Sequence, residues 1–197
     1  MAGHENLMMD AQSPPNIMID PVPYEAQLEP RARSSIQGIV IHCTETPDLE
    51  TAREFGERVL YASGTGNSGH YYIDVDGSVH QYVDIERVAH HVRGYNTQTI
   101  GIELVNAGRF PRWYDFDHQA MVHPYPEPQI AALMELLAKL RNDLPDLAWI
   151  AGHEDLDTDQ VPAANNPKQL IYRKRDPGPL FPWPRVVDAG WTRLGSD

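Results

Sequence analysis

The sequence predicts a single α/β (α+β) domain in which a central mixed β-sheet is flanked by helices. Three observations lead to this fold class: strand-like runs alternate with helical patterns, no period repeats along the chain, and 41% of the 197 residues are hydrophobic. A chain of this length and composition can bury a core of its own. Helices packed against a sheet are the simplest way to build it. We predict an extended N-terminal arm at residues 1–35 and the folded domain at residues 36–197.

The arm is predicted from its prolines. Pro14-Pro15, Pro21 and Pro23 lie among short apolar pieces such as Ile17-Met18-Ile19, and no helical or strand period is sustained. Clusters of this kind interrupt regular secondary structure. We therefore expect residues 1–35 to lie across the surface of the domain.

The strands are predicted from β-branched content and alternation. Residues 37–42 form a buried strand, and residues 70–83 form a hairpin that turns at Asp74-Val75-Asp76-Gly77. In the strand at 99–105, the apolar positions 100, 102 and 104 share one face, whereas Glu103 lies on the other. An acid among such neighbours is expensive to bury without a purpose, although it could instead face solvent on a one-sided sheet. A short strand near Trp149-Ile150 delivers His153.

Two helices complete the predicted domain. Asp48 can cap the first, which is expected to run to about Tyr61 because Ala52, Phe55 and Val59 recur at helical spacing. The second is expected to run from 127 to about 142. Its core stripe consists of Ile130, Leu133, Met134, Leu137 and Leu140.

Composition excludes several classes of protein. A net charge of −12 argues against a nucleic-acid binder, which usually carries a basic surface. No stretch reaches the roughly 18 apolar residues of a membrane span, and no secretory signal is seen, so a cytoplasmic location is expected. The single cysteine, Cys43, excludes an intrachain disulfide and a zinc site built on several thiolates. We expect Cys43 to be buried rather than a ligand, because it follows His42 on a strand and adjacent side chains point to opposite faces.

Two histidines and one aspartate stand beside strand ends or turns. His42 ends the strand at 37–42, His153 follows Gly152, and Asp176 precedes Pro177. A catalytic zinc takes three protein ligands and leaves a fourth position for water. Taken singly, each has an ordinary alternative, as a half-buried histidine or as the first residue of a turn. Together they predict a zinc hydrolase whose ligands come from distant segments.

A series of motifs around these residues resembles the sequence of a known family. The motifs occur in this order: Ile39-Val40-Ile41-His42, Ser68-Gly69-His70-Tyr71-Tyr72-Ile73, Asp76-Gly77, Gln81-Tyr82-Val83, Ile100-Gly101-Ile102-Glu103, Gly152-His153 and Asp176-Pro177-Gly178-Pro179. The series resembles the zinc-dependent N-acetylmuramoyl-L-alanine amidases of the type 2 amidase family, which share their fold with peptidoglycan recognition proteins. The resemblance covers roughly residues 37–183.

The resemblance implies a role for each matching residue. His42, His153 and Asp176 match the zinc ligands of the family. Glu103 matches the acid that takes a proton from the zinc-bound water, and Lys174 matches the lysine that stabilises the developing oxyanion. The bond cut by such enzymes joins the lactyl group of N-acetylmuramic acid to L-Ala of the stem peptide.

Substrate contacts are predicted around these residues. His91 matches a substrate-side histidine of the family, although His90 replaces the tryptophan that precedes it there. Arg173 and Arg175 flank Lys174 and could bind peptide or lactyl carboxylates, or could simply be solvated. The interval from His153 to Asp176 is long. Its polar, turn-rich stretch at 156–173 is expected to be a loop without regular structure that forms a rim or a lid.

The loop at 106–126 is expected to form the opposite wall. It offers four aromatic side chains to a sugar, or uses them to cover the helix below it. They are Phe110, Trp113, Tyr114 and Phe116.

Three roles remain open for such a protein. The first is an amidase of cell-wall recycling or remodelling, and the second is the same chemistry in a phage lysin or an injected antibacterial toxin. The third, a module that binds peptidoglycan without cutting it, is disfavoured because the matching ligands and catalytic residues are all present. The expected partner is a peptidoglycan or muropeptide substrate, with no nucleic acid and no integral membrane segment, and we expect a monomer.

Overall fold

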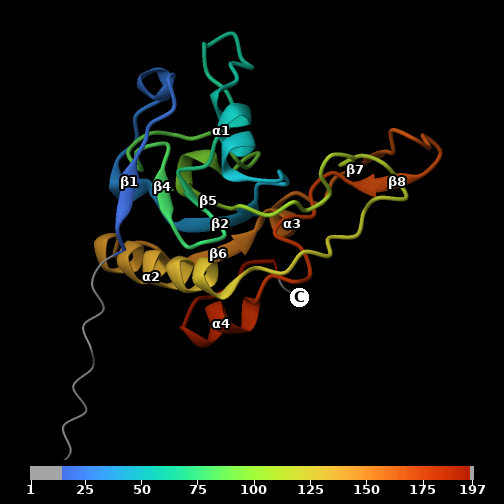
Figure 1. Cartoon of the computed structure of the whole chain (residues 1–197). Helices are drawn as coiled ribbons and strands as arrows, with labels where there is room; N and C mark the ends of the chain where they lie inside the picture. Colours follow the sequence, from blue (N-terminus) through green and yellow to red (C-terminus); the bar gives the residue numbers. More distant parts are fainter. Residues whose placement is uncertain (1–14, 196–197) are drawn as a thin grey trace, which may run out of the picture.

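A six-stranded mixed sheet forms the centre of the domain in the computed structural model, which describes residues 15–195 (Figure 1). The strands follow the order β1-β4-β3-β5-β2-β6. Neighbours are parallel except β3 and β4, which form the predicted antiparallel hairpin. The bounds are β1 Ile17–Ile19, β2 Gly38–Cys43, β3 Tyr71–Ile73, β4 Val79–Gln81, β5 Thr99–Leu104 and β6 Trp149–Gly152.

Helices cover both faces of this sheet, which confirms the predicted α/β class. Helix α1 lies on one face, and α2 and α4 lie on the other (Figure 1). The α-helices are α1 Leu49–Glu57, α2 Glu127–Asp143, α3 His153–Leu156 and α4 Trp183–Asp188, and the 3₁₀ helices are Glu25–Gln27, Arg33–Ser35 and Asn96–Gln98.

The start of α1 agrees with the prediction from the sequence, and its end does not. The predicted N-cap is confirmed, because the Asp48 carboxylate accepts a hydrogen bond from the N–H of Thr51 at 2.8 Å. The helix ends at Glu57, however, and does not continue to Tyr61. The chain turns back there, and the N–H groups of Leu60 and Tyr61 donate to the carbonyl oxygen of Thr65.

Strand alternation divides the interior into two cores. Ile39 and Ile41 of β2 pack with α2 in the larger core, so His42 points to the opposite face of the sheet. Glu103 of β5 follows the same rule, because its neighbours at 102 and 104 belong to the larger core. The smaller core, on the α1 face, consists of Val22, Tyr24, Leu28, Ala52, Tyr72, Tyr82, Val83 and Ala89. Burying an Ile or Leu side chain contributes about 1.5–3 kcal/mol, so the larger core carries most of the hydrophobic stabilisation.

The described part of the N-terminal segment is built into the domain. Strand β1 pairs with β4, and Val22, Tyr24 and Leu28 are buried in the smaller core. The guanidinium of Arg31 donates to three carbonyl oxygens between residues 85 and 99, at 2.7, 2.9 and 2.7 Å. The predicted boundary at residue 35 stays a prediction, and the first fourteen residues of the arm lie outside the described part of the chain.

The stretch between His153 and Asp176 differs from its prediction. It contains an antiparallel hairpin of β7 (Gln160–Pro162) and β8 (Leu170–Tyr172) in place of a loop without regular structure. This hairpin and the loop at 106–126 lie side by side (Figure 1). The N–H of Ala164 donates to the carbonyl oxygen of Tyr114 at 2.7 Å, which joins the two segments.

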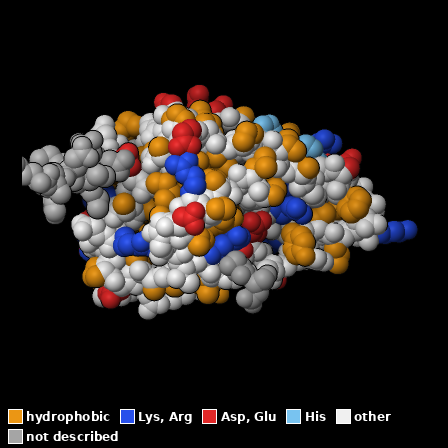
Figure 2. All heavy atoms as spheres, turned by 90° about the horizontal axis from the view of Figure 1, so that it is seen from below, with side chains coloured by type: hydrophobic (Ala, Val, Ile, Leu, Met, Phe, Trp, Pro, Cys, Tyr) orange, Lys and Arg blue, Asp and Glu red, His pale blue; other side chains and the backbone are white. Residues whose placement is uncertain are grey.

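Among the described residues, those on the face around α2 and α4 form no patch of one charge sign. Figure 2 shows basic and acidic side chains interspersed on this face. Ion pairs such as Lys139–Asp143 and Arg185–Glu127 account for part of this mixture. Across residues 15–195, no helix is both long enough and apolar enough to cross a membrane.

Candidate functional site

The candidate site lies where three parallel strands end at one edge of the sheet. In the register of the sheet, Ile41 of β2 pairs with Gly152 of β6, and His42 pairs with Glu103 of β5. His153 follows β6 directly, so it lies next to His42. Parallel pairing thus brings together residues that are distant in the sequence, because the carboxyl ends of parallel strands share one edge.

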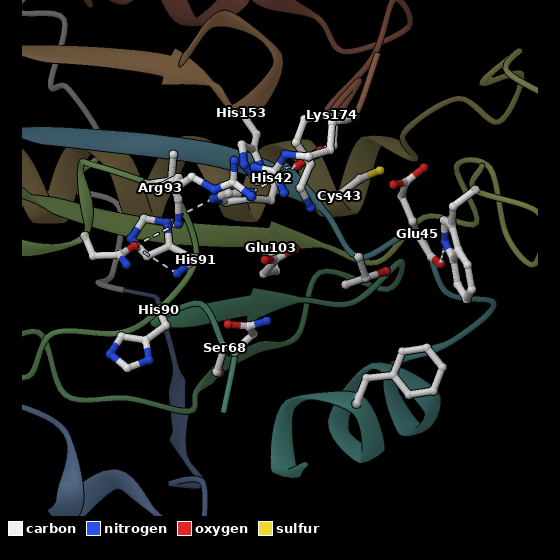
Figure 3. A pocket seen from close by; sticks show the side chains of 18 of the residues that line it. His42, Cys43, Glu45, Ser68, His90, His91, Arg93, Glu103, His153 and Lys174 are labelled. Atoms are coloured by element: carbon white, nitrogen blue, oxygen red, sulfur yellow. Dashed lines mark hydrogen bonds and ion pairs between the residues drawn. The ribbon is translucent and has the colours of Figure 1, made fainter. Parts of the chain in front are cut away.

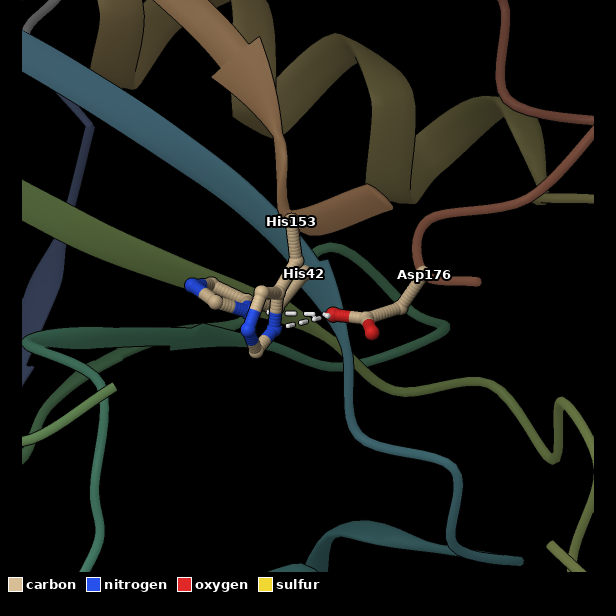
Figure 4. Close-up of side chains that lie close together, drawn as sticks. All are labelled: His42, His153 and Asp176. Carbon is tan, nitrogen blue, oxygen red and sulfur yellow. Dashed lines mark hydrogen bonds and ion pairs between the residues drawn. The ribbon is translucent and has the colours of Figure 1, made fainter. Parts of the chain in front are cut away.

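Three donor groups converge at this edge. His42, His153 and Asp176 are buried, and one donor atom of each lies within 4.8 Å of the others. The Nδ1 atoms of His42 and His153 lie 3.0 and 3.2 Å from Oδ2 of Asp176 (Figure 4). Burial alone would raise the pKa of Asp176, but the neighbouring His153 and the positive charge of Lys174 hold it well below its usual range.

A chain of hydrogen bonds fixes which nitrogen of His42 carries the proton. The Thr99 hydroxyl lies 2.8 Å from the carbonyl oxygen of Tyr95, which can only accept, so its hydrogen is donated there. The Thr99 oxygen then accepts from Nε2 of His91 at 3.3 Å. Burial lowers the pKa of His91 well below its usual value, so the ring has one N–H and its Nδ1 accepts from Nε2 of His42 at 3.0 Å. In the neutral His42 ring, Nδ1 therefore presents a lone pair to Asp176.

This arrangement fits a bound metal ion. Two acceptors that face each other at 3.0 Å, as His42 Nδ1 and Asp176 Oδ2 do, repel unless a cation lies between them. Asp176 Oδ1 and His153 Nε2 are buried with no hydrogen-bond partner among the described residues. Imidazole nitrogens and a carboxylate are a common donor set for a catalytic divalent metal. The three residues that the sequence predicts as ligands thus meet in a geometry that suits this role.

A pocket of about 900 Å³ opens on this group. Glu103 and Lys174 line it near the two histidines (Figure 3). Burial raises the pKa of Glu103, and the charge of Asp176 raises it further, whereas His42 and Lys174 lower it. A carboxylate with a raised pKa is suited to exchange protons near neutral pH.

The other residues predicted for substrate binding differ in whether they line the pocket. His91 lines the pocket but is also bonded to His42, and a Cβ on Gly101 would lie 2.6 Å from its ring, so only glycine lets the ring pack against β5. Trp113 lines the pocket, and its indole N–H donates to the carbonyl oxygen of Glu45. Arg175 is not part of the lining of this pocket.

The two walls of the pocket differ from their prediction. The loop at 106–126 forms one wall, whereas no residue of β7 or β8 lines the pocket. The hairpin is joined to that loop by the hydrogen bond from the N–H of Ala164 to the carbonyl oxygen of Tyr114. Of the four aromatic side chains in that loop, Trp113 and Tyr114 line the pocket. The opposite wall comes largely from the turn after α1 and from the segments around Ser68 and His90, and of these only the His90-His91 segment was predicted to face substrate. It consists of Phe55, Arg58, Tyr61, Asn67, Ser68, His90, Val92, Arg93 and Asn96.

A buried ion pair joins the wall formed by the loop at 106–126 to the edge of the sheet that carries the three donor residues. No pattern in the sequence indicated this ion pair. Glu45 lies just after β2, and both of its carboxylate oxygens accept from Arg109, at 2.7 and 2.8 Å. The same guanidinium donates to the carbonyl oxygens of Tyr172 and Arg173, immediately before Lys174. The side chain of Arg109 is only 1% exposed. Arg109 therefore holds three segments around the site.

The fold and this site are those of a hydrolase whose active site lies where the carboxyl ends of parallel strands meet in a mixed sheet. A family model described as N-acetylmuramoyl-L-alanine amidase matches residues 32–179. The chain therefore belongs to this family, and it is a peptidoglycan amidase. No curated relative matches the chain in sequence.

Solved structures share the fold at low sequence identity. The amidase LysC from Clostridium intestinale is 19% identical with a TM-score of 0.59, over 89% of this chain and 97% of that one. AmiD from E. coli, solved with anhydro-N-acetylmuramic acid-L-Ala-D-γ-Glu-L-Lys, is 22% identical with a TM-score of 0.58, over 82% of this chain and 59% of that one. The bumblebee peptidoglycan recognition protein SA is 17% identical with a TM-score of 0.56, over 79% and 93%.

Proposed function

We propose that the chain is a zinc-dependent amidase that cuts the amide between the lactyl group of N-acetylmuramic acid and L-Ala of the stem peptide. The observation that carries this proposal is the convergence of His42, His153 and Asp176 in one buried group, in which Asp176 Oδ1 and His153 Nε2 have no hydrogen-bond partner among the described residues. The ligand solved with AmiD begins its peptide with L-Ala-D-γ-Glu, and we extend that stem to the substrate of this chain.

The residues divide the chemistry among them. Bound by His42, His153 and Asp176, zinc would supply a Lewis acid that activates water and polarises the scissile carbonyl. Glu103 takes the proton of the attacking water and returns it to the leaving amine of L-Ala. The Lys174 ammonium stabilises the negative charge that develops on the carbonyl oxygen.

Removing the hydroxyl of Thr99 is expected to weaken zinc binding by about tenfold. The Thr99→Val substitution breaks the bonded chain that directs the proton of His42 to Nε2, and second-shell partners of this kind are typically worth 10- to 100-fold in metal affinity. Competition with a chromogenic zinc chelator measures the affinity without relying on turnover.

Thr65→Val is the matched control for that measurement. Thr65 is another buried threonine, and its hydroxyl forms a hydrogen bond with Ser63 and, among the described residues, with none of His42, His91 and Asp176. It should leave zinc affinity unchanged. Equal zinc affinity in the wild type and Thr99→Val would show that the bonded chain does not set the His42 tautomer.

Activity on cell-wall substrates tests the proposed function itself. Zinc-loaded protein should release free stem peptide from peptidoglycan or muropeptides, chelation should lower the rate at least 100-fold, and added zinc should restore it. Mass spectrometry identifies the products through the free amine of L-Ala. If zinc-loaded protein releases no stem peptide from any substrate, the proposed function is wrong.

Two forms of the substrate separate the biological roles. Cleavage of soluble muropeptides but not of intact sacculi favours recycling, whereas cleavage of sacculi favours remodelling or a lytic role. The cytoplasmic location expected from the sequence fits the first outcome and stays a prediction.

A further inference from the structure

The basic side chains of the pocket divide into paired and unpaired ones. Five line it, and three of these form ion pairs with acidic side chains. The pairs are Arg93–Asp159, Arg109–Glu45 and Arg173–Asp157. Within residues 15–195, no carboxylate forms an ion pair with Arg58 or with Lys174. Lys174 lies beside the three donor residues, where it is assigned to the oxyanion. Arg58 is therefore the unpaired basic group that can bind another part of the substrate.

Arg58 and Glu103 line the same side chamber of the main pocket. This chamber has a volume of about 270 Å³ and extends from Glu103 beneath the C-terminal part of α1. Phe55, near the end of α1, also lines it. Glu103 returns a proton to the leaving amine in the proposed mechanism, so the chamber lies on the side of the peptide that departs.

The position of Arg58 is set in advance of binding. The backbone N–H of Arg58 donates to the carbonyl oxygen of Phe55. A Cβ on Gly66 would lie 1.9 Å from the carbonyl oxygen of Arg58, so the 58–66 turn packs closely against the backbone of Arg58. Its guanidinium lies 4.0 Å from the centre of the Phe55 ring. A guanidinium stacked on an aromatic ring keeps its N–H groups free at the edge, where they match a carboxylate with two parallel hydrogen bonds.

We infer that Arg58 binds the free α-carboxylate of the γ-linked D-glutamate, the second residue of the stem. The inference rests on the proposed function, since it assumes that the peptide leaves from the side of Glu103. In a γ-linked glutamate the side-chain carboxyl forms the peptide bond, so the α-carboxylate keeps its negative charge. It is the first such charge after the cut amide. The proposed subsite therefore selects stems in which this carboxylate is not amidated.

Two synthetic substrates test this inference. Both are N-acetylmuramoyl tripeptides with the stem L-Ala-D-γ-Glu-L-Lys, and they differ only in carrying an α-carboxylate or an α-carboxamide on the second residue. The wild-type enzyme should prefer the carboxylate by about tenfold or more in kcat/KM, the usual range for a hydrogen bond to a charged group. Arg58→Gln should remove this preference by slowing the acid substrate alone, and Arg58→Lys should keep part of it.

Arg93→Gln is the matched control, because Arg93 lines the same pocket but is already paired with Asp159. It should preserve the preference. A ratio between two substrates does not depend on the fraction of folded enzyme, so a loss of stability cannot imitate the result. A wild-type enzyme that cuts both substrates equally, or an Arg58→Gln enzyme that keeps the wild-type ratio, would overturn the role of Arg58. Failure to cut either substrate, together with no release of stem peptide from sacculi, would instead overturn the proposed function.

Discussion

Replacing Glu103 by glutamine is expected to lower kcat by about 10²–10⁴-fold while zinc binding stays unchanged. Glutamine keeps the shape of the side chain but cannot accept the proton of the attacking water. Glu103 pairs with His42 in the register of β2 and β5, and it is not one of the three donor residues. Burial raises its pKa, which brings the carboxylate closer to the range in which it can take and return a proton at neutral pH.

Glu154 provides a demanding control for this prediction. It follows His153, and burial raises its pKa to about 7, so on proton affinity alone it is a candidate for the same role. It does not line the pocket, however, and its carboxylate lies 3.9 Å from Arg193. Glu154→Gln should keep turnover within about threefold of the wild type. Steady-state kinetics on a soluble muropeptide, with zinc content measured for each variant, compares them. If the loss of turnover follows Glu154 and not Glu103, the assignment of the base is wrong.

The parts of the fold that follow from local pattern were predictable from the sequence. Alternation at 99–105 places Glu103 opposite the apolar positions, and the structure confirms this, because Ile102 and Leu104 belong to the larger core and Glu103 does not. The helical stripe after residue 126 and the Asp48 cap are likewise local signals. The convergence of His42, His153 and Asp176 was predicted by residue type and by the family resemblance. The placement of His42 beside His153 follows from the pairing of β2 with β6, which no local pattern records.

The parts that depend on contacts between distant segments could not be predicted. Strand β1 has three residues between prolines, and its pairing with β4 outweighs that weak local signal. Val59 continues the helical spacing, but the closure of the 58–65 turn ends α1 at Glu57. This error also hid Arg58, which would have been one exposed residue on a longer helix. The hairpin β7–β8 was missed because prolines stand in and between its strands.

Replacing Arg109 by methionine is expected to lower the free energy of unfolding by about 3–5 kcal/mol. The substitution leaves the Glu45 carboxylate in the wall without its partner, and a buried charge that loses its partner carries most of this cost. It also leaves the carbonyl oxygens of Tyr172 and Arg173 without their donor. Urea unfolding followed by tryptophan fluorescence measures the change. Because those carbonyls precede Lys174, we also expect a lower kcat in the fraction that remains folded.

The exposed pair Arg93–Asp159 gives the comparison that separates burial from pairing. Both of its side chains are 67% exposed, whereas Arg109 is 1% exposed, so Arg93→Met should change the free energy of unfolding by less than about 1 kcal/mol. The double substitution Glu45→Met with Arg109→Met should recover part of the stability lost by Arg109→Met alone, because it removes the unpaired carboxylate. Equal losses in Arg109→Met and Arg93→Met would mean that the wall does not depend on this ion pair. A double variant less stable than Arg109→Met would instead show that Glu45 stabilises the wall through contacts other than Arg109.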